Sequence, residues 1–199
     1  MIGVFLDTET NGLNPKIHAI LEIAYQIVDL STGEVKEKYQ AVVAQPLEVW
    51  QKSDPGSLKV NGFTWEEVSL GNPLFRVKEE VIASLARWKV QRKEALFICQ
   101  NPSFDRIFFS QLIDPDIQEA LHWPYHWLDL ASMHWALSMK QSMRHQGPFP
   151  WDIGCSKDQI AAYYQLPPEE KPHRAMNGVQ HLLLCYTAVV GFPLQGISN

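Results

Sequence analysis

The segment IGVFLDTETNGL, residues 2–13, joins a short apolar run to two acidic side chains. The apolar residues before Asp7 are typical of a buried β-strand. Asp7 and Glu9 stand two positions apart where this run ends, so their side chains point to the same face of the strand. Two carboxylates held together repel each other unless a cation lies between them, and hard oxygen ligands suit Mg²⁺ or Mn²⁺. The alternative is a strand that ends in a solvated acidic turn.

The flanking sequence predicts the class of the fold. Residues 19–43 read as two strands joined at Ser-Thr-Gly, which with the first strand makes three antiparallel strands. Apolar residues recur every three or four positions over 74–92, which predicts an amphipathic helix. A buried strand over 95–100 and a helix over 103–113 follow. Strands first, then strands alternating with helices, predict an α/β domain with a mixed sheet.

The remaining segments divide into further helices and two irregular stretches. Helices are expected over 115–121, 129–140, 156–164 and 175–190, and irregular structure over 46–73 and 141–155. Neither a repeat nor a convincing boundary interrupts the chain, so residues 1–199 are predicted to form a single domain. The pair Asn177-Gly178 is out of place in the last helix, because Asn-Gly is a turn signal.

Composition and charge limit the function. The chain has 199 residues, of which 46% are hydrophobic, and a net charge of -5, so no broad basic surface for long duplexes is expected. Its three cysteines lack metal-ligand spacing and are read as reduced. No apolar run approaches 18 residues, and the N-terminus carries no basic region or cleavage site. These features predict a cytoplasmic enzyme with no membrane segment.

Asp105 is the third acidic residue of interest. It stands in the first turn of the helix that follows the strand over 95–100. Sites in open α/β sheets form at the carboxyl ends of strands, where Asp105 would meet Asp7 and Glu9. The alternative is an acid that only favours the helix dipole. Asn101 is expected either to fix the loop or to contact a substrate sugar.

His173 opens the last helix and is the candidate base. Its ordinary pKa lies near neutrality, so it could take a proton from water; the alternative is a structural or solvated histidine. His122, His126 and His134 lie in an aromatic region and are expected to be packing residues.

Three segments, in this order, resemble the motifs of a known family: FLDTETNGL, NPSFDRIFF and SKDQIAAYYQLPPEEKPHRAM. They are similar to the three motifs of the DEDDh, or DnaQ-like, 3′–5′ exonucleases, which include the proofreading subunit of bacterial DNA polymerase III, RNase T and oligoribonuclease. VNGFTWEEV and HWLDLASM resemble two subsidiary segments of that family. The resemblance implies an RNase H-like exonuclease fold, with a central mixed five-stranded sheet, three antiparallel strands first, flanked by helices.

The resemblance also implies roles for individual residues. Asp7, Glu9 and Asp105 would be catalytic metal ligands for two divalent cations, Mg²⁺ or Mn²⁺, about 3.5–4 Å apart, and His173 the general base. Residues near the terminal nucleotide would be Thr8, Thr10, Leu13, Asn101 and Phe104. The implied partner is the 3′ end of single-stranded DNA or RNA. RNase T and oligoribonuclease dimerise, so a homodimer is one alternative, and no protein partner is identified.

The third motif departs from the family at its last acid. The pattern His-x-Ala-x-x-Asp, counted from His173, reaches Gly178 instead of aspartate. His181, one helical turn further on, is a candidate substitute ligand, and the alternative is a solvated residue. Three outcomes stay open: an exonuclease with altered metal needs, a slow one, or a module that binds a 3′ end or a protein partner without cutting. For such a module the candidate base-stacking residues, otherwise core residues, are Trp123, Tyr125, Trp127, Trp135 and Trp151.

Overall fold

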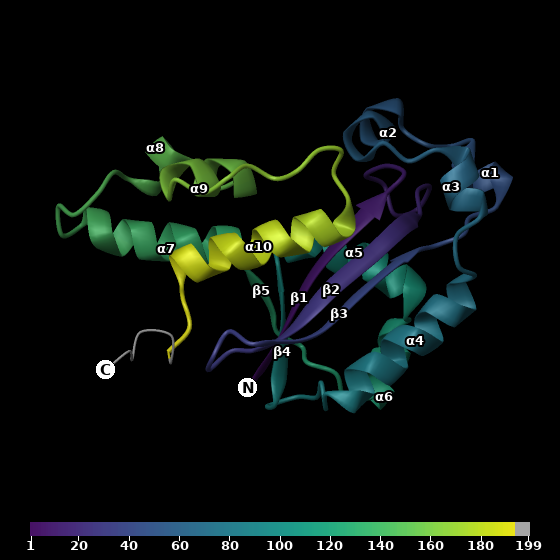
Figure 1. Cartoon of the computed structure of the whole chain (residues 1–199), viewed down its shortest axis with the longest axis horizontal. Helices are drawn as coiled ribbons and strands as arrows, with labels where there is room; N and C mark the ends of the chain where they lie inside the picture. The colour runs from purple at the N-terminus through teal and green to yellow at the C-terminus, as the bar shows by residue number, and fades with distance from the viewer. Residues whose placement is uncertain (194–199) are drawn as a thin grey trace.

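A computed structural model describes residues 1–193, so the last six residues of the expected domain lie outside the described part. Its centre is a five-stranded sheet in the order β3-β2-β1-β4-β5 (Figure 1). The strands are β1 (Ile2–Thr10), β2 (Ile20–Asp29), β3 (Val35–Val42), β4 (Ala95–Cys99) and β5 (Trp127–Asp129). β1 pairs antiparallel with β2 and parallel with β4, β2 is antiparallel to β3, and β4 is parallel to β5. The predicted mixed sheet, with three antiparallel strands first, is confirmed.

Helices cover both faces of this sheet. The longer ones are α4 (Leu74–Arg87), α5 (Pro102–Leu112), α7 (Leu130–Ser142) and α10 (Ala175–Val189). On one face, buried residues of α4 and α5 pack against β1, β2 and β4. On the other, α10, α7 and α9 (Lys157–Tyr163) pack against the same strands. Because both faces are covered, β2 is buried along almost its whole length.

The irregular stretch expected over 46–73 instead contains three short helices, so that expectation is wrong. They are α1 (Leu47–Trp50), α2 (Pro55–Asn61) and α3 (Trp65–Ser69). Local capping explains two of them. Asp54 accepts a hydrogen bond from the backbone of Ser57 at the start of α2, and Thr64 and Glu67 form a capping box at the start of α3. Such short helices leave little periodic signal.

Other boundaries differ less. α4 ends five residues before the expected end, and the backbone turns at Lys89, whose φ is 51°. The loop over 141–155 contains one short helix, α8 (Pro150–Ile153). α6 (Pro115–Ala120), α7 and α9 begin and end close to the expected residues. Among the helices of residues 1–193, none is both long and apolar enough to cross a membrane.

The pair Asn177-Gly178 makes no turn, because α10 continues through it. Its first turn is held by a side chain from the sheet: the backbone N–H of Ala175 donates to Glu22 Oε2 over 2.8 Å. Glu22 is buried, with 1% of its surface exposed. The start of α10 is therefore tied to β2, which brings Gly178 against the end of β1.

Candidate active site

Asp7 and Glu9 lie near the C-terminal end of β1, the central strand of the sheet. β1 is hydrogen-bonded to β2 along its length and to β4 over residues 2–5, so both neighbours hold it. The two carboxylates share one face, as predicted from their spacing. The side chain of Asp7 is 14% exposed. Glu9 stands opposite Glu22 in the β1–β2 register, which adds a further acid to the neighbourhood.

Asp105 reaches the same place from α5. It is 3% exposed, and its Oδ1 accepts hydrogen bonds from the backbone N–H of Thr8 over 3.0 Å and from the Thr8 hydroxyl over 2.9 Å. Oδ2 is therefore the oxygen left to face a ligand. These two bonds fix Asp105 to the residue between Asp7 and Glu9, so an acid from α5 lies beside the acids of β1. We call Asp7, Glu9 and Asp105 the acidic cluster.

The acidic cluster is short of positive charge. Burial raises the pKa of Asp105 well above its ordinary value, and the neighbouring Asp7 raises it further. Burial also raises the pKa of Asp7, although Lys157 beside it acts in the opposite direction. Burial, with the charges of Asp7 and Glu22, raises the pKa of Glu9 to about 8. Carboxylates crowded in this way gain from a bound cation.

His173 is fixed beside this cluster. Its backbone N–H donates to the carbonyl of Val60 in α2 over 3.1 Å, and the next residue, Arg174, pairs with Glu67 of α3 over 2.8 Å. Its Nδ1 lies 3.1 Å from Glu169 Oε1. A carboxylate only accepts, so Nδ1 carries the hydrogen and Nε2 is left without one. The side chain is 28% exposed, so His173 is neither freely solvated nor buried in the core.

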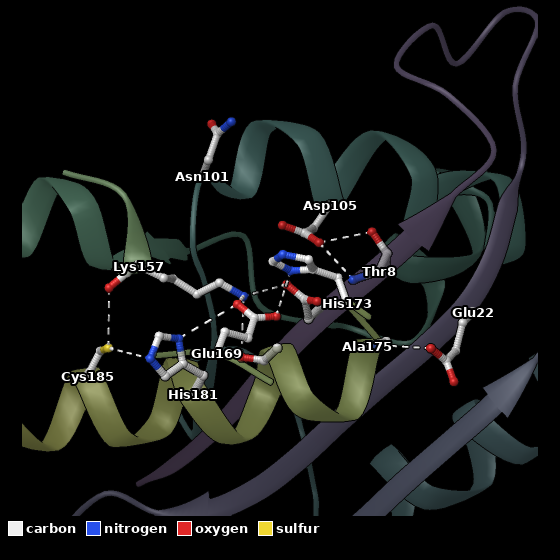
Figure 2. A network of polar contacts seen from close by, with 12 residues as sticks. Thr8, Glu22, Asn101, Asp105, Lys157, Glu169, His173, Ala175, His181 and Cys185 are labelled. Atoms are coloured by element: carbon white, nitrogen blue, oxygen red, sulfur yellow. Dashed lines mark hydrogen bonds and ion pairs between the residues drawn. The ribbon is translucent and has the colours of Figure 1, made fainter. Parts of the chain in front are cut away.

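Glu169 joins His173 to Lys157 and His181 (Figure 2). Its Oε2 lies 2.9 Å from Lys157 Nζ and 3.7 Å from His181 Nδ1. Burial alone would raise the pKa of Glu169, but His181 and Lys157 outweigh it and lower the pKa to about 2. Glu169 is therefore ionised at any ordinary pH. We call Lys157, Glu169, His173 and His181 the lysine network.

His181 is 5% exposed, so the expectation of a solvated residue is wrong. Its Nε2 lies 3.0 Å from the carbonyl oxygen of Pro167, to which it donates. The Cys185 thiol and the Glu169 carboxylate beside it raise the pKa of His181 to about 10. Because Nε2 donates to Pro167 and Nδ1 lies 3.7 Å from Glu169 Oε2, the observed contacts make His181 a neighbour of Glu169.

Gly178 stands where the resemblance places a fourth acid, and neighbouring side chains occupy the space beside its Cα. A Cβ built on this residue would lie 2.7 Å from Asp7 Cγ, closer still to Asp7 Oδ2, and 3.1 Å from Lys157 Nζ. Lys157 Nζ is itself 3.6 Å from Asp7 Oδ1. The Asp7 carboxylate and the Lys157 ammonium thus use the space that a side chain at 178 would need.

The donor set agrees with a metal site in its chemistry but not in every position. Three carboxylates suit one hard divalent cation. Over residues 1–193, however, no three His, Cys, Asp or Glu side chains are gathered closely enough to hold a metal ion. Asp7 is drawn toward Lys157, and position 178 supplies no ligand. The three carboxylates therefore fit a divalent cation by their chemistry, and the ammonium beside Asp7 adds a positive charge that opposes a second cation.

A cleft of about 430 Å³ opens next to Glu9. Its wall includes Leu13, 75% exposed, and Phe104 at the start of α5. Thr8 and Thr10 also line it, but their hydroxyls donate inward, to Asp105 and to the carbonyl of Gly12. The other lining residues are Glu9, Asp54, Gly56, Ser57, Val60 and Asn61. Apolar walls beside a group of acids suit a nucleobase next to its phosphate.

The contacts of Asn101 fix the loop that follows β4. It has a left-handed backbone with φ 59°, and its N–H donates to Asp129 Oδ1 over 3.0 Å, which joins the ends of β4 and β5. Its side chain accepts from the Ser103 hydroxyl over 2.6 Å, and the residue is exposed.

The aromatic residues divide between core and surface. Trp123 is buried and Trp127 stacks on Phe97 with ring centres 4.2 Å apart. Exposed rings that remain candidates for stacking are Tyr125, Trp135 and Trp151, with exposures of 54%, 41% and 56%. Of the histidines expected to pack, His134 is fully buried, whereas His122 and His126 are exposed, so for these two the expectation is wrong.

Sequence reasoning missed Lys157, Glu169 and Glu22. Lys157 and Glu169 both lie within the third segment quoted above, but neither is a position of its His-x-Ala-x-x-Asp pattern. One signal was present: Glu169 precedes His173 by four residues, and an acid at that distance is a candidate partner for the imidazole. No such signal links Lys157 to Asp7, because 149 residues separate them.

Comparisons with known proteins agree with this fold. No protein-family model matches the chain, and neither does any curated protein. Solved structures do match. The zinc-bound form of E. coli exonuclease I with single-stranded DNA has a TM-score of 0.69 and 15% identity, over 94% of this chain and 40% of that one. Exonuclease I from Methylocaldum szegediense has a TM-score of 0.73 and 15% identity, over 94% and 40%.

A third match is a 3′-exonuclease that recognises the histone mRNA stem-loop at its 3′ end, with a TM-score of 0.68 and 13% identity, over 97% of this chain and 65% of that one. The chain therefore spans about two-fifths of the exonuclease I chains. At identities this low, the structural likeness shows the fold alone, which is that of these exonucleases. The predicted RNase H-like exonuclease fold is confirmed.

Proposed function

We propose that this protein is a metal-dependent 3′–5′ exonuclease that hydrolyses single-stranded or short nucleic acid and releases nucleoside monophosphates. The observation that carries the proposal is the acidic cluster beside a fixed histidine, at the edge of a cleft of about 430 Å³. The exonuclease fold supports it, since the matching proteins act on or bind single-stranded DNA and an RNA 3′ end by their descriptions.

Asp7, Glu9 and Asp105 would hold a divalent cation, Mg²⁺ or Mn²⁺. A cation held there makes a bound water more acidic and offsets charge on the phosphate. Without it, the negative charge of the acidic cluster would repel a nucleic-acid backbone. Asp105 is preorganised for this role by its two hydrogen bonds from Thr8.

His173 would act as the general base. Its Nε2 is free to accept a proton from water, while Nδ1 donates to Glu169. The carboxylate of Glu169 stabilises the imidazolium that forms. The water oxygen bonds to phosphorus as the bond to the 3′ oxygen breaks, and that oxygen takes a proton from solvent. Leu13 and Phe104 would hold the terminal base in the cleft, which sets the scissile phosphate beside the acids.

The experiment uses single strands of DNA and RNA labelled at the 5′ or the 3′ end, incubated with Mg²⁺ or Mn²⁺. A 3′–5′ exonuclease releases the 3′ label as a mononucleotide and shortens 5′-labelled strands stepwise. Asp105→Asn should lower the rate at least about 100-fold, whereas Asp116→Asn, an exposed acid of α6, should leave it unchanged. Shortening that persists in Asp105→Asn or in chelator refutes the proposal.

A second candidate is a module that binds 3′ ends without cutting them. The observation in its favour is Lys157, whose ammonium stands among the carboxylates where the family has metal ligands. Binding of labelled strands with no shortening in either metal would select this function. Binding and shortening together would select the first.

A further inference from the structure

Lys157 carries a positive charge into the site from α9. Its side chain is 14% exposed, and its Nζ lies 2.9 Å from Glu169 Oε2 and 3.6 Å from Asp7 Oδ1. It is also 3.5 Å from the carbonyl oxygen of Gly178. Three acceptors from three segments therefore surround one ammonium. Two of these contacts are ion pairs with carboxylates, and the third is a long hydrogen bond to a backbone carbonyl.

The ammonium and a side chain at position 178 exclude each other. A Cβ on Gly178 would lie 3.1 Å from Lys157 Nζ and 2.7 Å from Asp7 Cγ, so no aspartate fits there while both groups stay in place. The glycine therefore does more than omit a ligand. It makes the room in which Asp7 and the ammonium of Lys157 meet.

The ammonium of this lysine is held by two ion pairs, to Glu169 Oε2 at 2.9 Å and to Asp7 Oδ1 at 3.6 Å. A buried charge without a partner costs several kcal/mol, so removing the ammonium would leave Asp7 uncompensated, whereas Glu169 would keep its contacts with His173 and His181. Lys157 thus supplies, permanently, the positive charge that a loosely held metal ion would otherwise bring.

We propose that Lys157 is a built-in cation, which joins Asp7 to Glu169 in place of a second divalent metal ion, so that the acidic cluster binds one ion and not two. The inference rests on the proposed function, because it takes the acidic cluster to be a metal site. Glu169 is then the acid that replaces the missing fourth one, and it acts through Lys157 on Asp7 and directly on His173.

The number of bound Mn²⁺ ions tests this inference without any activity measurement. Free Mn²⁺ gives a sharp electron paramagnetic resonance signal that is lost on binding, so titration of the whole protein counts the bound ions. Two ions about 4 Å apart also couple magnetically, which separates a pair in the site from an ion elsewhere. We expect one bound ion and no coupling in the wild-type protein.

Neutral variants of Lys157 should open the second site. Lys157→Met removes the ammonium from Asp7 and from Glu169 Oε2, so two coupled ions are expected. Lys157→Met combined with Glu169→Gln removes that new ligand as well, so the count should return to one. Lys140→Met, which changes an exposed lysine of α7, should bind one ion. Should Lys157→Met fail to fold, Lys157→Gln is the second neutral variant. The number of ions bound by the wild-type protein is a test that requires no variant.

Two coupled ions in the wild-type protein, or one ion in a folded Lys157→Met or Lys157→Gln variant, would overturn the inference, as would the absence of any bound ion. Shortening of labelled strands is measured separately on the same samples. A protein that binds one Mn²⁺, gains a second in the variant and cuts nothing would refute the exonuclease and leave the role of Lys157 standing.

Discussion

Replacement of Gly178 by alanine should destabilise the protein, although the same change normally stabilises a helix. Gly178 lies inside α10, where alanine is ordinarily favoured by about 0.5–1 kcal/mol. Here the new methyl group would lie 2.7 Å from Asp7 Cγ, more than 0.5 Å inside an ordinary contact of about 3.5–4.0 Å. Either Asp7 must leave Lys157 or α10 must move away from β1.

The net effect follows from two opposing contributions. Overpacking of a close contact costs about 1–3 kcal/mol, which exceeds the helix gain, so we expect a loss of about 1–2 kcal/mol. In a chain of this length that corresponds to a fall in Tm of about 2–8 °C. Gly178→Asp should lose more, because its carboxylate adds repulsion from Asp7 of about 4 kcal/mol at 4 Å and an effective dielectric constant of 20, which Lys157 offsets only in part.

Thermal unfolding and Mn²⁺ titration of the same samples measure both consequences. Gly178→Ala should lower Tm and, because it displaces Asp7, weaken Mn²⁺ binding. Gln180→Ala, an exposed position of the same helix, is the control and should change the free energy of unfolding by less than about 0.5 kcal/mol. A higher Tm in Gly178→Ala with unchanged Mn²⁺ affinity, or faster hydrolysis in Gly178→Asp, would refute the reasoning.

Three further predictions concern charge, the base and the cleft. In metal-free protein, the pKa of Glu9 rises from 4.5 to about 8 on folding, so the folded state binds this proton more tightly. The free energy of unfolding should therefore be lost as pH rises from 4.5 through 8, by at most about 5 kcal/mol; urea unfolding that is as stable at pH 9 as at pH 5 would contradict this. Glu169→Gln removes the charge that orients His173, so kcat should fall about 10-fold or more, with little change in KM and an altered pH profile of kcat; an unchanged profile would remove Glu169 from the mechanism. Leu13→Ala should raise KM for single strands without changing Tm, since Leu13 is 75% exposed, whereas the exposed control Leu70→Ala should change neither; equal KM in both would exclude Leu13 from base binding.

The sequence by itself determined most of the longer strands and helices. An apolar run that ends in Asp7 and Glu9 marks a buried strand, the period of the apolar residues marks α4, and apolar residues with good helix formers mark α10, because burial imposes these patterns along the chain. The helices between residues 46 and 73 were not predicted from the sequence, because each has at most seven residues and depends on caps rather than on periodicity.

The sequence also placed the three acids and the histidine, since each adjoins the end of a buried strand or the start of a helix. It could not say what fills the space left by the missing fourth acid. That depends on Lys157, Glu169 and Glu22, which come from three separate segments and meet only when α9 and α10 pack against β1 and β2. Local pattern determines which elements form; tertiary packing decided that Gly178 faces an ammonium and a carboxylate, because charge pairing and close contact act only between groups that folding brings together.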